Sequence, residues 1–181
     1  DTWLNTGGMG AVSPVPFENN EFLQKVEETI VQPTIHVIQS RGLDYKGFIF
    51  IGLMVVEGKP YVLEYNVRMG DPETEVVIPR LASDLVELLE ATRDGQLADK
   101  TIAIDPRTCA TVMLVSGGYP QAYEKGKVMT GWEQTNDSIL FHAGTKSVDQ
   151  KVATNGGRVL AITSFGDSIL EAVQQSLENA A

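Results

Sequence analysis

The chain has 181 residues, of which 43% are hydrophobic, and a formal net charge of −10 at pH 7. The negative charge excludes nucleic acid and anionic membranes as favoured partners, and no apolar run approaches the ~18 residues that a membrane-spanning helix needs. A single cysteine, Cys109, excludes a disulfide framework within the chain, so we expect a cytoplasmic protein in which Cys109 is a buried structural thiol.

The first elements in chain order are a loop and a long helix. The loop runs to Phe17. Residues 20–40 place apolar side chains at helical spacing and predict a helix with one apolar face. Pro33 lacks a backbone N–H group and its ring collides with the carbonyl group four residues earlier, so we expect the helix to kink or break near Gln32.

An antiparallel hairpin is predicted after this helix. Residues 45–56 and 59–65 are rich in apolar and β-branched side chains, and Glu57-Gly58 separates them as a turn. A second helix is predicted over residues 83–93. We expect Ser83 to be its N-cap, because a hydroxyl oxygen accepts a hydrogen bond from the first turn.

The remainder of the chain predicts short strands and one closing helix. Polar turn residues over 96–107 indicate a connection between an N-terminal domain, residues 1–95, and a C-terminal domain, residues 108–181. The expected strands are residues 108–116, 139–142 and 158–164. The whole pattern predicts an α+β protein: an antiparallel sheet with helices, followed by a small, mainly β domain.

The closing helix has a recognisable start. Ser168-x-x-Glu171 resembles a capping box, in which the hydroxyl and the carboxylate each accept a backbone N–H bond. The apolar residues after it predict that the helix buries Leu170, Val173 and Leu177.

The residues best suited to chemistry follow the second strand of the predicted hairpin. Glu64, Asn66 and Arg68 alternate along the strand end, so we expect their side chains on one face. A carboxylate and an amide oxygen on a rigid strand suit Mg²⁺, which prefers oxygen ligands. The Arg68 guanidinium can hold a phosphate oxygen or a carboxylate. This spacing predicts a site for phosphoryl transfer.

A stiff acidic loop is predicted directly after these residues. Gly70 permits a sharp turn, and Pro72 fixes its own φ and biases Asp71 toward extended backbone. Asp71 and Glu73 are therefore expected to be held beside the strand end. The alternative for the whole stretch is an exposed strand end that runs into a solvated polar loop.

The opening Gly7-Gly8-Met9-Gly10 string leaves two interpretations open. Its backbone N–H groups could approach a bound anion, or the string could be a flexible turn at a domain edge. The chain starts at Asp1, within reach of this loop and without an initiator methionine. We therefore expect the sequence to be a piece of a longer protein.

Several strings of the sequence carry a family resemblance. They are Asn5-Thr6-Gly7-Gly8-Met9-Gly10-Ala11, Tyr45-Lys46-Gly47, Gly52-Leu53-Met54, Glu64-Tyr65-Asn66-x-Arg68-x-Gly70-Asp71-Pro72-Glu73, Ser116-Gly117-Gly118-Tyr119-Pro120, His142-Ala143-Gly144-Thr145 and Gly157-Arg158-Val159-Leu160. Together they resemble the phosphoribosylamine–glycine ligases of purine biosynthesis, which are ATP-grasp enzymes. The resemblance spans essentially the whole chain, and it implies the C-terminal half of an ATP-grasp domain followed by the family's small C-terminal domain.

The resemblance also implies a reaction with its cofactors and partners. ATP would phosphorylate the carboxylate of glycine to glycyl phosphate, and the amine of 5-phosphoribosylamine would then form the amide and release phosphate. Mg²⁺ or Mn²⁺ would offset the charge that moves with the phosphoryl group. The implied partners are these two small molecules and the missing N-terminal portion of the same polypeptide.

By the same resemblance, Glu64 and Asn66 are metal ligands, and Arg68 stabilises the transferring phosphoryl group or the acyl phosphate. Asp71 and Glu73 orient the amine or the glycine, or only brace the loop. The residues expected to line the substrate side of the cleft are Asn5, Thr6, Gly7, Gly8 and Met9.

The sequence departs from the family in three respects. Residues 50–54 contain no acidic side chain, although many ATP-grasp enzymes have a further metal ligand there, and Trp3 stands where the family usually has a small turn residue. The half of ATP-grasp whose lysines hold ATP is absent, so we expect the chain alone to be inactive. The alternatives are another ATP-grasp ligase or carboxylase of nucleotide synthesis, and a non-catalytic binding module.

Overall fold

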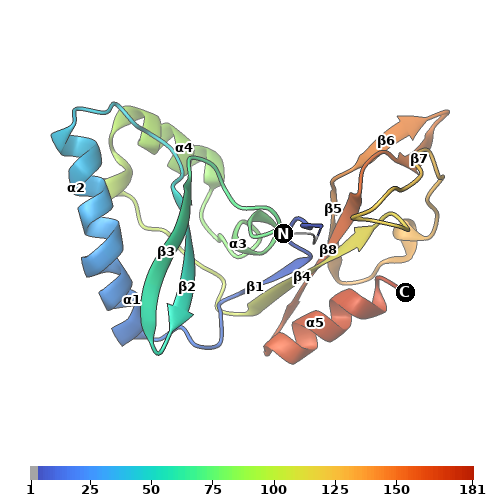
Figure 1. Ribbon diagram of the computed structural model, residues 1–181, viewed down its shortest axis with the longest axis horizontal. Helices are drawn as coiled ribbons and strands as arrows, with labels where there is room; N and C mark the ends of the chain where they lie inside the picture. Colours follow the sequence, from blue (N-terminus) through green and yellow to red (C-terminus); the bar gives the residue numbers. More distant parts are fainter. Residues whose placement is uncertain (1–3) are drawn as a thin grey trace. The chain divides into compact units, whose positions relative to one another are not determined.

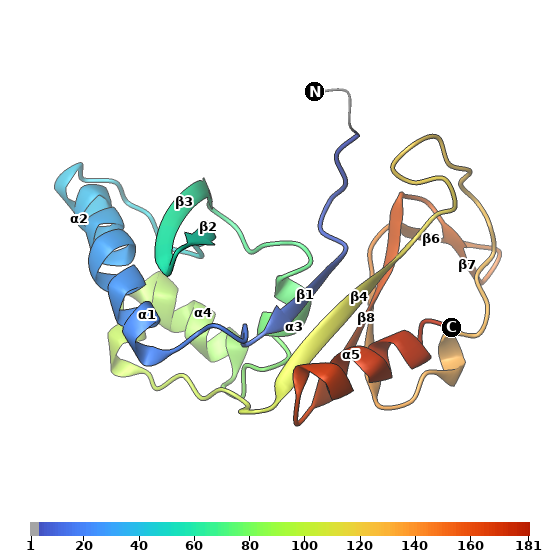
Figure 2. The ribbon, with the colours of Figure 1, turned by 60° about the horizontal axis from the view of Figure 1, so that its bottom comes forward.

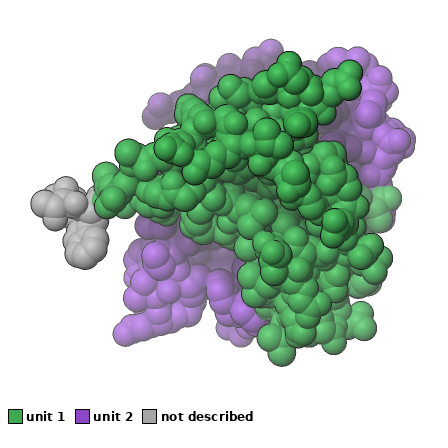
Figure 3. Space-filling model, turned by 90° about the vertical axis from the view of Figure 1, so that its right-hand side faces the viewer, with its two compact units in different colours: residues 1–13, 71–82, 104–181 green, residues 14–70, 83–103 purple. Residues whose placement is uncertain are grey.

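The computed structural model describes residues 4–181, so the expectation about Trp3 lies outside the described residues. The chain forms two compact units, coloured separately in Figure 3. Unit 1 consists of residues 1–13, 71–82 and 104–181, and unit 2 of residues 14–70 and 83–103. Each unit is therefore built from segments that are separated in the sequence. The division into residues 1–95, 96–107 and 108–181 follows the order of the sequence and stays a prediction.

Unit 2 begins with a helical rod that changes its winding in the middle. The rod consists of α1 (Asn20–Val26), a π-helical stretch (Glu27–Val31) and α2 (Gln32–Ser40). The Gln32 N–H group donates to the Glu27 carbonyl, five residues back, and Pro33 follows in the first turn of α2. The helix does not break near Gln32, because residues 20–40 all stay helical. The winding widens directly before Pro33, and the wider turn accommodates the proline ring and its missing N–H group.

The predicted hairpin is confirmed, although its first strand begins at Phe50 rather than at Tyr45. Strands β2 (Phe50–Val56) and β3 (Lys59–Asn66) pair antiparallel, and the rod lies alongside them in Figures 1 and 2. Both turn residues have positive φ, 50° at Glu57 and 70° at Gly58. A turn of this kind matches the right-handed twist of the two strands.

Helix α4 (Leu85–Asp94) begins later than predicted. Asp84 is the N-cap, because its Oδ1 accepts a hydrogen bond from the Glu87 N–H group at 3.0 Å. The prediction of Ser83 is therefore wrong. The Ser83 hydroxyl oxygen instead accepts the Ala103 N–H group at 2.8 Å, a contact 20 residues away in sequence. A short 3₁₀ turn, η2 (Leu97–Asp99), follows the helix.

Unit 1 is organised around a four-stranded antiparallel sheet in the order β1-β4-β8-β5. Its strands are β1 (Gly10–Ser13), β4 (Thr108–Val115), β8 (Arg158–Gly166) and β5 (Ser138–His142). The last three confirm the predicted strands. β1 lies within the stretch predicted as a loop, because four residues between a glycine-rich string and Pro14 are too few to show a period.

Smaller elements complete unit 1. They are α3 (Thr74–Val77), the 3₁₀ turn η3 (Trp132–Gln134), and the hairpin of β6 (Thr145–Val148) with β7 (Lys151–Thr154). The hairpin turns at Asp149 and Gln150, with φ of 48° and 61°. The sequence does not predict this hairpin, because its turn lacks the usual Asn-Gly or Asp-Gly pair.

Helix α5 (Ile169–Glu178) packs on β4 and β8 (Figure 1). The predicted cap is confirmed, since the Ser168 Oγ accepts the Glu171 N–H group at 3.2 Å. The prediction that Leu170 and Leu177 are buried is wrong: they are 74% and 52% exposed. Val173 is half-buried.

The face of α5 that meets the sheet is built from small residues. Ala172 and Ser176 are fully buried. The Ser176 hydroxyl group lies 3.1 Å from the Ala110 carbonyl oxygen and 2.8 Å from Ser164 Oγ. Short side chains let the helix backbone approach the sheet closely, which turns the longer leucines outward.

The core of the sheet contains the single cysteine. Cys109 has no exposed surface, and burial raises the pKa of its thiol to about 11. The prediction of a structural thiol is confirmed, because a reactive cysteine needs a lowered pKa. No helix within residues 4–181 has the length and apolar character needed to cross a membrane.

Candidate active site

Glu64 and Asn66 lie together at the end of β3 in unit 2. The Asn66 Nδ2 donates to the Glu64 Oε1 at 2.9 Å, as expected for side chains two residues apart on one face of a strand. Gly52 lies opposite Glu64 on β2, and a Cβ atom there would be 3.1 Å from the Glu64 Cγ. The neighbouring strand therefore leaves room for the carboxylate.

Arg68 lies beyond the strand. β3 ends at Asn66, whose partner Phe50 is the first residue of β2, so no strand remains to pair with the residues that follow. The Arg68 Nη1 donates to the Met69 carbonyl oxygen at 2.9 Å. The prediction that Arg68 continues the alternation of the strand is therefore wrong. Arg68 nevertheless follows Asn66 by only two residues.

The donor set of Glu64 and Asn66 fits a divalent cation such as Mg²⁺ or Mn²⁺. A carboxylate and an amide supply hard oxygen ligands, and the amide would turn its oxygen toward the ion. The described residues contain no cluster of three or more His, Cys, Asp or Glu side chains that could hold a metal. The pair therefore suits an ion that takes its other ligands from water and from the phosphates of a nucleotide.

In unit 1, Arg158 brings the acidic loop and the glycine-rich string together. It is the first residue of β8. Its Nη2 donates to the Asp71 Oδ2 at 2.8 Å, and its Nη1 donates to the carbonyl oxygens of Asp71 and Gly8 at 3.1 and 3.0 Å. The sequence alone indicates no role for Arg158, although this residue lies in a string that carries the family resemblance. Its partners are 87 and 150 residues away.

The glycine-rich string is anchored within unit 1. The Gly7 N–H group donates to the Tyr119 hydroxyl oxygen at 2.9 Å, and the Met9 carbonyl oxygen accepts the Met113 N–H group at 3.0 Å. Gly10 already belongs to β1. The string is therefore held in place rather than a loose turn, and the N–H group of Gly7 is engaged within the protein. Tyr119, like Arg158, is a contact that sequence analysis did not predict.

Glu73 and Glu75 continue the acidic loop. The Glu73 carbonyl oxygen accepts the N–H groups of Val76 and Val77, so this residue starts α3. The Glu75 Oε2 is buried and has no hydrogen-bond partner among the described residues. Burial raises the pKa of the Glu75 carboxyl group, and the charge of Asp71 raises it further, while the Arg158 charge lowers it. The sequence alone indicates no separate role for Glu75.

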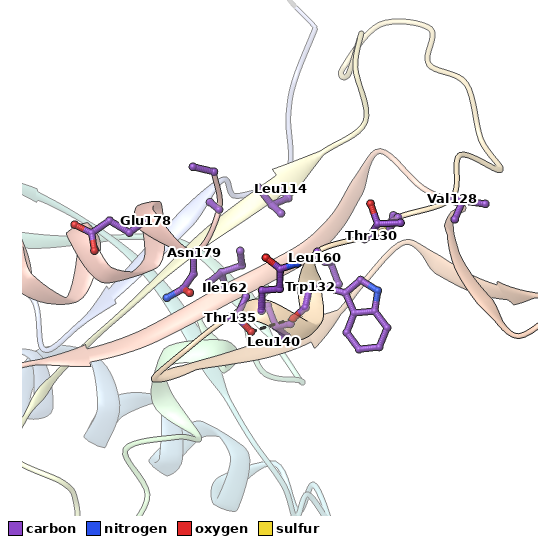
Figure 4. A pocket seen from close by; sticks show the side chains of 15 residues that line it. Leu114, Val128, Thr130, Trp132, Thr135, Leu140, Leu160, Ile162, Glu178 and Asn179 are labelled. Carbon is purple, nitrogen blue, oxygen red and sulfur yellow. Dashed lines mark hydrogen bonds between the residues drawn. The ribbon is translucent and has the colours of Figure 1, made fainter.

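A cavity of about 610 Å³ lies elsewhere in unit 1 (Figure 4). Leu114, Leu160 and Ile162 of the sheet line it, together with Trp132 and the end of α5 near Asn179. Its lining includes none of the residues that the sequence predicts for the site. The predicted chemistry and this cavity are therefore separate features.

The antiparallel hairpin of unit 2 ends in Glu-x-Asn, and it lies in the part of the chain that matches an ATP-grasp domain. The chain therefore contains part of a domain of the ATP-grasp class. Two family models match in succession. The phosphoribosylglycinamide synthetase ATP-grasp (A) domain matches residues 1–74, and the phosphoribosylglycinamide synthetase C domain matches residues 109–181. The chain belongs to the phosphoribosylglycinamide synthetase family.

Individual relatives are similar over nearly the whole chain. A protein of Chlorobaculum tepidum named phosphoribosylamine–glycine ligase is 44% identical over 178 residues, which are 97% of this chain and 42% of that protein. A Vibrio cholerae protein of the same name is 43% identical over 181 residues, or 98% and 42%. The crystal structure of the Thermotoga maritima phosphoribosylamine–glycine ligase superposes with a TM-score of 0.82 at 38% identity, covering 98% of this chain and 44% of that one.

The chain therefore spans about 42% of the length of the curated relatives that it matches. A more distant structure, the N5-carboxyaminoimidazole ribonucleotide synthetase of Thermotoga maritima, has a TM-score of 0.57 at 13% identity, covering 94% of this chain and 44% of that one. This likeness extends to the fold alone.

Proposed function

We propose that this sequence is part of a phosphoribosylamine–glycine ligase that uses ATP to join glycine to 5-phosphoribosylamine. The products would be glycinamide ribonucleotide, ADP and phosphate, in the cytoplasmic synthesis of purines. The observation that carries the proposal is the 44% identity, over 97% of the chain, to a relative of that name. The contact between Glu64 and Asn66 supports it, because these are the oxygen donors that a phosphoryl-transfer site requires.

In this proposal, the residues of unit 2 handle the phosphoryl group. Glu64 and Asn66 would hold Mg²⁺ or Mn²⁺, which, when bound, neutralises charge on the phosphates of ATP. Arg68 would direct its guanidinium to the moving phosphoryl group or to the acyl phosphate of glycine, where a fixed positive charge stabilises developing negative charge. A carboxylate becomes a usable electrophile only after one of its oxygens has become a phosphate leaving group.

The residues of unit 1 would handle the two small-molecule substrates. Asp71 and Glu73 would orient the amine or the glycine, or brace the loop. The substrate side would be lined by Asn5, Thr6, Gly7, Gly8 and Met9. The lysines that hold ATP would come from an N-terminal portion of the same polypeptide, since the chain spans about 42% of its relatives. Residues 1–95 would then complete the ATP-grasp domain, and residues 108–181 would form the C-terminal domain.

The test is ADP release by the full-length protein with ATP, Mg²⁺, glycine and freshly made 5-phosphoribosylamine. Glu64→Gln removes the charge of the proposed metal ligand. Glu57→Gln is its matched control, because Glu57 lies in the turn at the opposite end of the same hairpin. We expect release that needs both substrates, is lost in Glu64→Gln and is retained in Glu57→Gln.

Two other outcomes would change the proposal. Release with a different carboxylate or amine would keep the ATP-grasp chemistry and replace the substrates. No release with any pair of substrates would contradict an enzymatic function and favour a non-catalytic binding module.

A further inference from the structure

Arg158 is the inner partner of an ion pair at the proposed substrate side. Its side chain is 21% exposed, whereas that of Asp71 is 53% exposed. A planar guanidinium holds its partners in fixed directions, because its N–H groups form a rigid fork. Here the fork holds one carboxylate oxygen and two backbone carbonyl oxygens from different segments. The Asp71 loop and the Gly8 backbone are therefore positioned by the same side chain.

The backbone that carries Arg158 is itself fixed. The Arg158 carbonyl oxygen accepts the Gly144 N–H group at 2.9 Å, and the Gly157 carbonyl oxygen accepts the Ser116 N–H group at 2.7 Å. A Cβ atom at Gly157 would overlap the ring of Tyr119. The guanidinium thus extends from a strand end that is packed on several sides. Supporting contacts of this kind hold a functional group in its working geometry.

The ion pair leaves part of Asp71 for a substrate. The Arg158 Nη2 donates to the Asp71 Oδ2, and the Asp71 side chain remains 53% exposed. Burial and the charges of Asp71 and Glu73 raise the pKa of the Glu75 carboxyl group, and the Arg158 charge lowers it, so Glu75 lies near two other carboxyl groups and one guanidinium. Excess negative charge repels a phosphate or a carboxylate and attracts an amino group, whose N–H donors suit a carboxylate oxygen.

We propose that Arg158 is a positioning residue, which holds Asp71 and the Gly8 backbone so that Asp71 binds the amino group of a substrate. The inference rests on the proposed function and adds a residue that the sequence does not assign to the reaction. Both proposed substrates carry an amino group, so the experiment has to distinguish glycine from 5-phosphoribosylamine.

The test compares four variants of the full-length enzyme by steady-state ADP release: Arg158→Gln, Arg158→Lys, Asp71→Asn and the double variant Arg158→Gln/Asp71→Asn. Arg107→Gln is the matched control, because Arg107 also pairs with an aspartate in unit 1, Asp105, at 2.7 Å. For Arg158→Gln we expect kcat/KM for one amino substrate to fall at least tenfold, through a higher KM. The KM for ATP should stay within twofold, and Arg107→Gln should resemble the wild type.

The pattern across the variants identifies the role. A raised KM for either glycine or 5-phosphoribosylamine supports the inference. The substrate whose KM rises is the one whose amino group Asp71 binds. The double variant should lose no more than the single variants, because both changes remove the same interaction. Arg158→Lys keeps the charge but not the planar fork, so it should recover only part of the loss.

Four results would overturn the inference. One is a lower kcat with every KM unchanged, which indicates fewer folded molecules. The others are losses that add in the double variant, full recovery in Arg158→Lys, and wild-type kinetics in Arg158→Gln. If Arg158→Gln does not fold, Arg158→Lys and Asp71→Asn carry the test. A wild-type enzyme that releases no ADP would instead contradict the proposed function, which is a separate result.

Discussion

The close packing around Gly8 predicts a large penalty for adding a single methyl group. An alanine Cβ at this position would lie closer than 3.0 Å to the Pro72 Cδ, a separation that real Cβ atoms essentially never show, and 3.3 Å from the Asp71 carbonyl oxygen. Pro72 is almost completely buried and its ring is rigid, so it cannot yield without moving the loop. Overpacking of this kind costs about 1–3 kcal/mol, which corresponds to a fall in Tm of about 2–12 °C for a chain of this length.

The assay is thermal and urea denaturation of Gly8→Ala beside two other glycine variants. Gly117→Ala is the control, because a Cβ atom there meets nothing within 4 Å, and its stability should change by no more than about 0.5 kcal/mol. Gly7→Ala should be intermediate, since the atom it meets at 2.8 Å is the Arg158 Cζ, near the end of a flexible side chain. Equal stability of Gly8→Ala and Gly117→Ala would refute the packing argument.

Three further predictions concern other parts of the chain. Glu75→Gln should unfold less readily than the wild type at pH 7, and the two proteins should be equally stable below pH 4.5. The raised pKa of Glu75 means that its contribution to stability is present at low pH and is lost as the carboxyl group ionises, which urea titrations at both pH values would measure. Ser176→Ala should cost about 1–2 kcal/mol in the same assay, because it leaves buried polar partners unsatisfied; an unchanged midpoint would contradict this. The 181 residues alone should give no glycine-dependent ADP release in a coupled assay, and any such release would contradict the proposal that the ATP-holding half lies outside this sequence.

The sequence predicted the elements that are stabilised by contacts between residues close together in the chain. Glu57-Gly58 predicted the hairpin because a two-residue turn of positive φ selects its own strand pairing. Ser168 predicted the start of the closing helix, since its hydroxyl group is bonded within the first turn. The alternation of Glu64 and Asn66 predicted a shared face for the same reason: two residues on one strand need no other part of the fold to bring them together.

Features that depend on distant contacts were missed or misplaced. Ser83 and Asp84 are both good cap residues, and the contact of Ser83 with Ala103 leaves Asp84 as the cap. Leu170 and Leu177 were expected in the core, but the sheet meets the small residues of α5 instead, which periodicity alone does not decide. Arg158 was not foreseen as a partner of Asp71, because no local pattern links residues 87 positions apart.

The glycine-rich string shows why a motif needs its surroundings before it can be interpreted. The sequence allowed two interpretations of this string, an anion-binding loop or a flexible turn. Both assume that the backbone of the glycines is not packed against other residues of the protein. In the structure the space beside Gly7 holds the Arg158 guanidinium, and the space beside Gly8 holds the Pro72 ring. The absence of side chains on these glycines is therefore required by two other motifs of the same sequence, Gly-Arg and Asp-Pro. Because the three motifs fill one another's space, a change in any of them should alter the position of Asp71, and kinetic effects of Gly7→Ala and Arg158→Lys should overlap rather than add.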